Sequence, residues 1–437
     1  LAASKGHQVI ISDISGIVSG INQGILAPGI FHTKSLTPTK KKIARHQTFV
    51  NKGFLITSID EEAGLDIDGY EEFSKTRYSE HTIGQSSMIF GWGPDDVETL
   101  KLDYSKHSSK ILKTGSPRAD LWKPLFADYW NWNIPRNTPK KPFLLISSNL
   151  TFANNMLSFH EIIINHKRAG YYQREPWLFN YHFGVTAEHY LTTAAFIKAI
   201  QHLSKHNNGY DIVFRPHPVE NIEIWKTFLD GIPNVHVIRE GCISAWVNKA
   251  FAVMHNGCST AFEATVSKKP VVTYVPYLQK YGNEPPNKLG YRVETSEELL
   301  NKINSIFDNL KSEGQKNVNK PLPDTVSKKI FIDDDELAAD KIVKIWDSLA
   351  NENFSQTSNW IKFQWFLKAI KFKRMVGKVL KKLFPSRFGS YKENYKFPSL
   401  NIHDISKRIN SLRRVLGIDE KLECKLLSER TILIKRH

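Results

Sequence analysis

The feature that most constrains this fold is the alternation of short apolar segments with longer stretches of helical periodicity. In residues 1–125 the apolar segments are HQVIISD, KGFLITSID, SSMIFGWG and SKILKTG. In residues 140–348 they are KPFLLISSN, YDIVFRPHP, NVHVIRE and two segments within 250–277, and residues 187–206 carry a helical pattern. Strands that alternate with helices form parallel sheets joined by right-handed crossovers. The sequence therefore predicts an α/β fold.

Two such halves predict two Rossmann-like domains that face each other across a cleft, the GT-B arrangement. The first domain spans residues 1–125 and is expected to lack its first strand, because the chain begins in what reads as the end of a helix. The polar stretch NWNIPRNTPKKP leads into the second domain, residues 140–348. Residues 351–437 are expected to form a basic, amphipathic helical extension.

The positive charge of the chain is concentrated in this extension. The net charge is +16, and residues 351–437 hold 20 Lys and Arg against 7 Asp and Glu. A nucleic-acid-binding protein would be expected to carry basic residues over its folded part, so no nucleic-acid partner is predicted. No apolar run is long enough to span a membrane. The three cysteines have no disulfide or metal-ligand spacing, which fits a cytoplasmic location.

The first part of the extension has the pattern of a membrane-surface helix. Residues 360–387 contain nine Lys and Arg and no acid, and basic amphipathic helices with aromatic residues bind anionic membranes. The expected apolar face consists of Phe363, Leu367, Ile370, Val376, Leu380 and Leu383. Alternatively, this face packs back onto the two domains. We expect a peripheral protein at the inner face of the cytoplasmic membrane.

Polar residues gather where a strand of the second half ends in the turn HNGCST. Asn256 and Gly257 form a turn signal, and Ser259 and Thr260 stand where a helix begins. Glu263 follows Thr260 at capping-box spacing. Free N–H groups at a helix N-terminus favour an anion. The turn therefore predicts a phosphate-binding site, with Glu263 accepting hydrogen bonds from a ribose, although an ordinary capped crossover would look the same.

Other strand ends supply further candidates, because ligands of parallel sheets bind beyond the carboxyl ends of the strands. Ser148 and Asn149 follow one strand, Arg215 and His217 of RPHP follow another, and Tyr274 ends a third. An Arg fork beside a helix N-terminus can hold a phosphate without a metal. The alternatives are a structural histidine between two prolines and an arginine in a surface ion pair.

Three consecutive carboxylates follow the strand GFLIT of the first half: Asp60, Glu61 and Glu62. One of them could take a proton from an acceptor hydroxyl, whereas a solvated acidic loop is the alternative. Further strand-end and loop residues on the expected acceptor side are Asp13, His32 and Lys34. The P-loop, the dinucleotide fingerprint, the HExxH motif and a metal-binding aspartate pair do not occur in a supporting context. We therefore expect neither a cofactor nor a metal.

Three motifs together resemble bacterial surface-carbohydrate biosynthesis proteins of the GT-B fold: GSPRADLW, RPHP and HNGCSTAFEATVSKKPVVTY. More distantly they are similar to capsule transferases that use a CMP-activated ulosonic acid (Kdo or a sialic acid) and to CDP-glycerol transferases. The resemblance covers about residues 1–345. It implies that His217 contacts the nucleotide phosphate. The sialyltransferase-like enzymes carry an acidic pair followed by Gly, whereas here Ala63 separates Glu62 from Gly64, so the acting carboxylate stays open.

The expected function is that of a metal-independent glycosyltransferase of surface polysaccharide, capsule or lipopolysaccharide biosynthesis. Its expected partners are a nucleotide-activated sugar, with CMP-Kdo or a similar donor first, and a lipid-linked or oligosaccharide acceptor. The alternatives are a sugar-nucleotide epimerase or a CDP-glycerol-type transferase on the same fold, and a non-catalytic scaffold. Whether the reaction inverts or retains configuration is left open.

Overall fold

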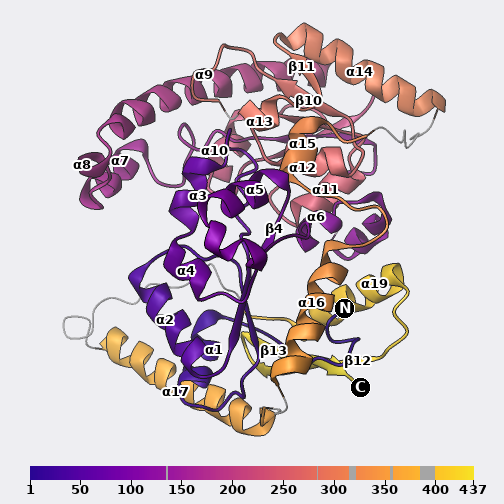
Figure 1. The fold of residues 1–437 in the computed structure, drawn as a ribbon. Coiled ribbons are helices and arrows are strands. Elements are labelled where there is room, and N and C mark those ends of the chain that lie inside the picture. Colours follow the sequence, from indigo (N-terminus) through magenta and orange to yellow (C-terminus); the bar gives the residue numbers. More distant parts are fainter. Residues whose placement is uncertain (134–135, 283, 314–320, 355–357, 384–398) are drawn as a thin grey trace. The chain divides into compact units, whose positions relative to one another are not determined.

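The computed structural model describes residues 1–133, 136–282, 284–313, 321–354, 358–383 and 399–437. The chain forms two compact units (Figure 1). The first unit comprises residues 1–63, 71–120 and 331–437, and the second comprises residues 64–70 and 121–330.

The second unit is built around a six-stranded, wholly parallel sheet of strand order β11-β10-β9-β6-β7-β8. Its strands are β6 (Phe143–Ser147), β7 (Asp211–Arg215), β8 (Val235–Val237), β9 (Ala252–His255), β10 (Val271–Tyr274) and β11 (Tyr291–Val293). This is the doubly wound order, in which the chain starts at a central strand and winds outwards in both directions. The predicted Rossmann-like α/β fold is confirmed here.

Helices cover both faces of this sheet, which explains why its strands are continuous apolar runs. All five residues of β6 are buried, and Phe196, Phe214 and Trp225 belong to the core beside them. The helices of the whole second unit are α7 (Phe159–Arg168), α8 (Tyr171–Arg174), α9 (Trp177–His206), α10 (Ile222–Phe228), α11 (Ile243–Lys249), α12 (Thr260–Val266), α13 (Glu284–Asn287), α14 (Ser296–Glu313) and α15 (Asp324–Lys329). The helix expected at 187–206 begins earlier, at Trp177.

The first unit contains a four-stranded parallel sheet of order β2-β3-β4-β5. The strands are β2 (Ile30–Thr33), β3 (Leu55–Ile59), β4 (Met88–Gly91) and β5 (Ile111–Lys113). The helices that follow them in the chain are α2 (Lys40–Asn51), α3 (Glu71–Arg77), α4 (Glu80–Gly84), α5 (Pro94–Asp103) and α6 (Pro117–Asp120). Alternation of strands and helices thus gives a parallel sheet in this unit as well, as predicted.

A second, antiparallel sheet in the first unit was not predicted. Strand β1 (Val9–Ser12) does not join the parallel sheet but pairs with β13 (Thr431–Arg436), which also pairs with β12 (Leu422–Ser428). The expectation of a wholly helical extension is therefore wrong for these last strands. The extension was interpreted from its basic charge and not from its apolar residues, of which Ile432 and Leu433 are buried. No local signal pairs these residues with a strand more than 400 residues away in sequence.

Within the described residues, the C-terminal part of the chain contributes to the first unit the helices α16 (Ala338–Asn353), α17 (Trp360–Leu383) and α19 (Ile402–Leu416). Helix α17 lies along α1 (Ile14–Asn22) and β12 (Figure 1). Two glycines of α1 allow a close approach. A Cβ at Gly20 would lie 2.7 Å from Phe363 Cε2, and one at Gly16 would lie 3.1 Å from Leu367 Cδ2.

This packing corrects the expected membrane face of α17. Phe363 and Leu367 are buried, Ile370 is half-buried, and Val376 is exposed. The side chains of Leu380 and Leu383, and the rest of the stretch to Arg387, lie outside the described residues. The predicted stripe is therefore a packing face at its N-terminal end, because small residues on α1 provide a groove that the sequence of the tail alone cannot show.

Candidate functional site

The switch point of the six-stranded sheet lies between β6 and β9, where successive crossovers leave in opposite directions. Ser147 at the end of β6 is in register with Arg215 of β7 on one side and His255 of β9 on the other. The loops that follow these three strands begin with Ser148, with Pro216-His217 and with Asn256. Ligands of such sheets bind at this point, so the structure brings together most of the residues that the strand-end rule selected.

A cluster of hydroxyl and thiol groups lies at the switch point, where β6 and β9 end. Ser147 Oγ lies 3.3 Å from Thr260 Oγ1 and 3.4 Å from Cys258 Sγ, and Cys258 Sγ lies 3.1 Å from Thr260 Oγ1. Ser259 caps α12 without a side-chain hydrogen bond and is exposed. The predicted capping box between Thr260 and Glu263 does not form, because Thr260 is already inside the helix. Ser259 is consequently the hydroxyl of this turn that can meet a ligand.

The turn itself is held by a ring of amides. Asn256 donates from Nδ2 to the Tyr274 carbonyl at 2.8 Å and accepts from Gln279 at 3.1 Å. The Gly257 amide donates to Asn287 Oδ1 at 2.7 Å, and Gly257 has a left-handed φ of 64° that favours glycine. Asn149 donates to the Gly257 carbonyl at 2.9 Å. These contacts fix the backbone around which a ligand would bind.

His217 presents a defined tautomer. Its Nδ1 accepts a hydrogen bond from the Val219 amide at 3.3 Å, so the proton of the neutral ring resides on Nε2. Burial, with a smaller contribution from Arg239, lowers the pKa of His217 below its ordinary value, while Asp66 acts in the opposite direction. His217 is half-buried and therefore offers a neutral N–H donor at the end of β7.

Glu220, which sequence reasoning missed, connects two of the strand-end loops. It is fully buried and accepts hydrogen bonds from Ser148 Oγ at 2.9 Å, from the Leu150 amide at 2.8 Å and from Trp225 Nε1 at 2.6 Å. The only sequence signal was an acid three residues after His217. Its carboxylate therefore joins the turn after β6 to the loop that contains RPHP.

Arg239 is a second missed residue. It follows β8, donates to the Glu220 carbonyl and contributes to the lowered pKa of His217. The strand-end rule, applied to NVHVIRE, would have found it.

Arg215 is engaged by the backbone. Its guanidinium donates to the carbonyls of Glu240 at 2.6 Å, Gly241 at 3.0 Å and Arg239 at 3.1 Å, and lies over the Trp246 ring. Burial lowers its pKa to about 10. These contacts hold the loop after β8, and a direct phosphate contact by Arg215 stays a prediction.

Two further candidates lie inside the second unit. Tyr274 is buried, packs against Phe196 and lies with its hydroxyl 3.4 Å from Ser296 Oγ. Glu263 is buried within α12, 3% exposed. Their roles in donor binding stay predictions, whereas Asn149, His217 and Ser259 are the predicted residues with surface available to a ligand.

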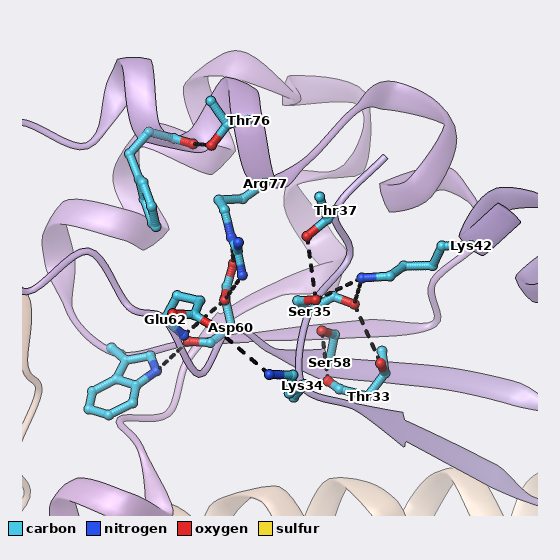
Figure 2. A network of polar contacts seen from close by, with 12 residues as sticks. Thr33, Lys34, Ser35, Thr37, Lys42, Ser58, Asp60, Glu62, Thr76 and Arg77 are labelled. Carbon is cyan, nitrogen blue, oxygen red and sulfur yellow. Dashed lines mark hydrogen bonds and ion pairs between the residues drawn. The ribbon is translucent and has the colours of Figure 1, made fainter. Parts of the chain in front are cut away.

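In the first unit, Asp60 is a structural anchor of the acidic loop (Figure 2). Arg77 donates to Asp60 from Nε at 2.6 Å and from Nη2 at 2.7 Å, and the Glu62 amide donates to Asp60 Oδ1 at 3.0 Å. Asp60 is 2% exposed. Glu62 is exposed and lies 3.9 Å from Lys34 Nζ in an ion pair, which corresponds to the solvated alternative.

Glu61 differs from its two neighbours. Among the described residues, none forms a hydrogen bond or ion pair with its carboxylate, and the side chain is half-buried. Burial raises its pKa, while Arg118 of the GSPRADLW motif acts in the opposite direction. The Glu61 amide donates to the Lys34 carbonyl at 3.0 Å, which joins the loops after β3 and β2. Of the three acids, Glu61 has the surroundings of a proton-transfer group.

The three predicted acceptor-side residues, Asp13, His32 and Lys34, line a single cavity of the first unit. Asp13 caps α1 by accepting from the Gly16 amide at 3.1 Å. His32 lies 3.0 Å from Thr57 Oγ1 and meets Trp346 edge to face. His32 lines the cavity. Desolvation by the surrounding protein lowers its pKa to about 4.

The described residues also bear on metal binding and membrane crossing. No three His, Cys, Asp or Glu side chains are grouped so that they could hold a metal ion, and metal-independent chemistry stays a prediction. No helix in the described ranges combines the length and apolarity needed to cross a bilayer.

Comparison with known proteins gives no family model and no curated protein that matches the chain. Among solved structures, the chain is similar to a Listeria monocytogenes protein assigned as UDP-N-acetylglucosamine 2-epimerase, with 15% identity, a TM-score of 0.45 and coverage of 79% of this chain and 81% of that one. For the UDP-GlcNAc 2-epimerase of Methanocaldococcus jannaschii, the identity is 13% and the TM-score is 0.43, with 76% of this chain and 81% of that one covered. For the wall teichoic acid polymerase TagF, the identity is 11% and the TM-score is 0.41, with 69% of this chain and 70% of that one covered.

These activities correspond to the same-fold alternatives of the sequence analysis and not to a CMP-ulosonic acid transferase. With identities of 11–15% and TM-scores of 0.41–0.45, the similarity assigns neither an activity nor a substrate to this chain.

Proposed function

We propose that this protein is an enzyme that uses a nucleotide-activated sugar or polyol and transfers its activated group to an acceptor in surface-carbohydrate biosynthesis. The observation that carries the proposal is the convergence of three polar strand-end loops at the switch point of the six-stranded sheet. Asn149, His217 and Ser259 there offer neutral hydrogen-bond donors to a phosphate.

His217 is given the role of stabilising the departing nucleotide phosphate. Its Nε2–H donates to an oxygen that gains negative charge as the bond to the activated group breaks, and an interaction that strengthens in the transition state accelerates the reaction. Ser148 and Glu220 hold the RPHP loop in place. Ser148 Oγ accepts a hydrogen bond from the His217 amide at 3.4 Å and donates one to the Glu220 carboxylate at 2.9 Å. The protein thus supplies these donors from loops fixed by buried hydrogen bonds.

Glu61 is given the role of the base that takes the proton of the acceptor hydroxyl. Its raised pKa brings it closer to the range in which a carboxylate transfers protons at neutral pH. Asp60 and Glu62 are excluded from this role in the proposal because Arg77 and Lys34 already pair with them.

A thermal-shift panel with CMP, CDP, UDP and GDP tests the proposal, since a ligand of the native state raises the melting temperature. Stabilisation by CMP alone would favour the CMP-ulosonic acid donor implied by the RPHP resemblance. Stabilisation by CDP would favour a CDP-glycerol-type donor. If none of the four nucleotides shifts the melting temperature, the protein does not use the proposed donors and the scaffold alternative prevails.

An epimerase is the second candidate, because the half-buried Glu61 could equally remove a proton from a sugar carbon. It would be stabilised by UDP and would exchange that proton with solvent. Incubation with UDP-N-acetylglucosamine in D₂O, without an acceptor, separates the two: deuterium in the recovered sugar identifies the epimerase, and unlabelled substrate supports the transferase.

We further propose that α17 places this enzyme on an anionic membrane, with a face other than the predicted one. Ile361 and Trp365 are each 67% exposed and Phe372 is 62% exposed. Their spacing puts them on one side of the helix, away from the packed Phe363 and Leu367. Lys362 and Lys368 beside them are also exposed, and residues 360–383 contain no acid. Basic charge around apolar surface fits an anionic bilayer.

Co-sedimentation with anionic vesicles at low salt tests this assignment. The triple variant Ile361→Ser/Trp365→Ser/Phe372→Ser should lose at least tenfold in binding, and Leu102→Ser, which alters an 81% exposed leucine on α5, should bind normally. A triple variant that sediments like the unmodified protein would remove α17 as the anchor. A dimer of the unmodified protein that this variant abolishes would assign the face to a second copy instead.

A further inference from the structure

A large cavity of the first unit has a mixed chemical character. Its volume is about 1360 Å³, and it is bordered by β1, β2, α16 and the segment 399–408, which includes the start of α19. The cavity wall includes Ile10, Ile17, Phe31 and Trp346. A site of this size can hold an organic molecule rather than a single ion.

Basic side chains outnumber acids in this cavity. The lysines and arginines on its wall are Lys34, Lys42, Arg45, Arg408 and Arg430, whereas the carboxylates are Asp13 and Asp404. Asp13 is already engaged as the cap of α1. The wall therefore carries positive charge in excess, and a cleft lined by positive charge favours an anionic ligand.

Three of the cations belong to one cluster on the loop after β2 and the start of α2: Lys34, Lys42 and Arg45. Lys42 donates to Ser35 Oγ at 2.7 Å and to the Ser35 carbonyl at 3.1 Å (Figure 2). Burial, assisted by Arg45, lowers the pKa of Lys42 to about 8, while Asp60 opposes the shift. These cations are close enough to repel one another.

Arg45 is the member of the cluster without a described partner. It is half-buried, its Nε is buried without a hydrogen bond, and no ion pair with a described residue is present. A guanidinium normally satisfies its donors on carboxylate or phosphate oxygens. A phosphate in the cavity would supply acceptors to the guanidinium of Arg45, which lines the cavity wall.

We propose that this cavity binds an organic phosphate whose phosphate group contacts Lys34, Lys42 and Arg45 and whose apolar portion lies along the aliphatic and aromatic wall. In the proposed transferase such a ligand is the acceptor, carried either by a lipid or by a soluble phosphate ester. This site lies in the first unit alone and does not depend on nucleotide binding in the second.

Titration calorimetry on the full chain, without any nucleotide, tests it with three probes: decyl phosphate below its micelle concentration, inorganic pyrophosphate and decanol. Decyl phosphate should bind at least tenfold more tightly than decanol. Arg45→Gln and Lys34→Gln should each weaken it about tenfold, the loss of one charge-assisted hydrogen bond. Lys106→Gln, an exposed lysine outside the cavity wall, is the matched control and should bind normally.

The probes also separate the two sources of the phosphate. Tighter binding of decyl phosphate than of pyrophosphate identifies a lipid-linked ligand, and equal binding identifies a soluble one. Failure of both to bind, or binding that is unchanged in both cavity variants while their melting temperatures match the unmodified protein, overturns the proposal. A protein that binds decyl phosphate but no nucleotide would keep this site and refute the proposed transferase.

Discussion

Arg77 holds Asp60 through two parallel hydrogen bonds, from Nε to Oδ2 at 2.6 Å and from Nη2 to Oδ1 at 2.7 Å. This fork separates the roles of two adjacent carboxylates, since Glu61 has no such partner among the described residues. It also gives the acidic loop a fixed starting point directly after β3, from which Glu61 and Glu62 project differently.

The first prediction contrasts these two acids. Asp60→Asn should lower the free energy of unfolding by about 3 kcal/mol, because it breaks a largely buried ion pair and leaves Arg77 uncompensated. Glu61→Gln should keep its stability but lose turnover by two or more orders of magnitude, with nucleotide binding unchanged. Urea denaturation and single-turnover assays check the pair, and a Glu61→Gln variant with normal turnover would remove Glu61 as the base.

The second prediction concerns His217. His217→Ala should lower turnover about a hundredfold without unfolding the protein, because the donor at the end of β7 is lost. His217→Gln should recover part of this loss, since its amide N–H can replace Nε2–H. The pKa of His217 lies below 6.5, so the donor stays neutral and turnover should not change between pH 7 and 8 through this group. Equal activity of the Ala and Gln variants would contradict the donor role.

The third prediction tests the contact between α1 and α17. Gly20→Ala should destabilise the protein by about 1–3 kcal/mol, because the new Cβ meets Phe363 at 2.7 Å. Its higher helix propensity, worth about 1 kcal/mol, would otherwise stabilise α1. Gly29→Ala is the control, since a Cβ there has no heavy atom within 4 Å. Equal melting temperatures for Gly20→Ala and Gly29→Ala would show that α17 does not pack closely on α1.

The fourth prediction concerns stability in acid. Burial, assisted by Arg45 and Lys42, lowers the pKa of His46 to about 4, and burial lowers that of His255 to about 3. The unfolded chain therefore binds more protons than the folded one below pH 6.5, and stability falls as the pH drops towards 4, by up to about 1.4 kcal/mol per pH unit for each histidine. His46→Leu should reduce this slope in urea titrations at pH 7, 6 and 5, whereas an unchanged slope would mean that His46 does not contribute.

The sequence by itself determined the elements and the class of fold. Apolar strands alternating with helices predicted both parallel sheets, and the strand-end rule selected Ser148, His217 and Ser259 from their positions in the chain alone. These features are local, because each depends on residues within one strand–loop–helix unit and on a connection rule that holds for all parallel sheets. Charge patterning likewise located α17, but not the face it exposes.

Only the tertiary structure decided which residues share an environment. Whether Asp60, Glu61 or Glu62 stays available depended on Arg77 and Lys34, which come from other parts of the chain. The guanidinium of Arg215 donates to carbonyls of the loop after β8. Phe363 packs closely against α1 at Gly20. Pairing of β1 with β13 joins the two ends of the chain. Each outcome rests on contacts between residues distant in sequence, whose closeness depends on packing of the whole unit and leaves no local pattern to detect.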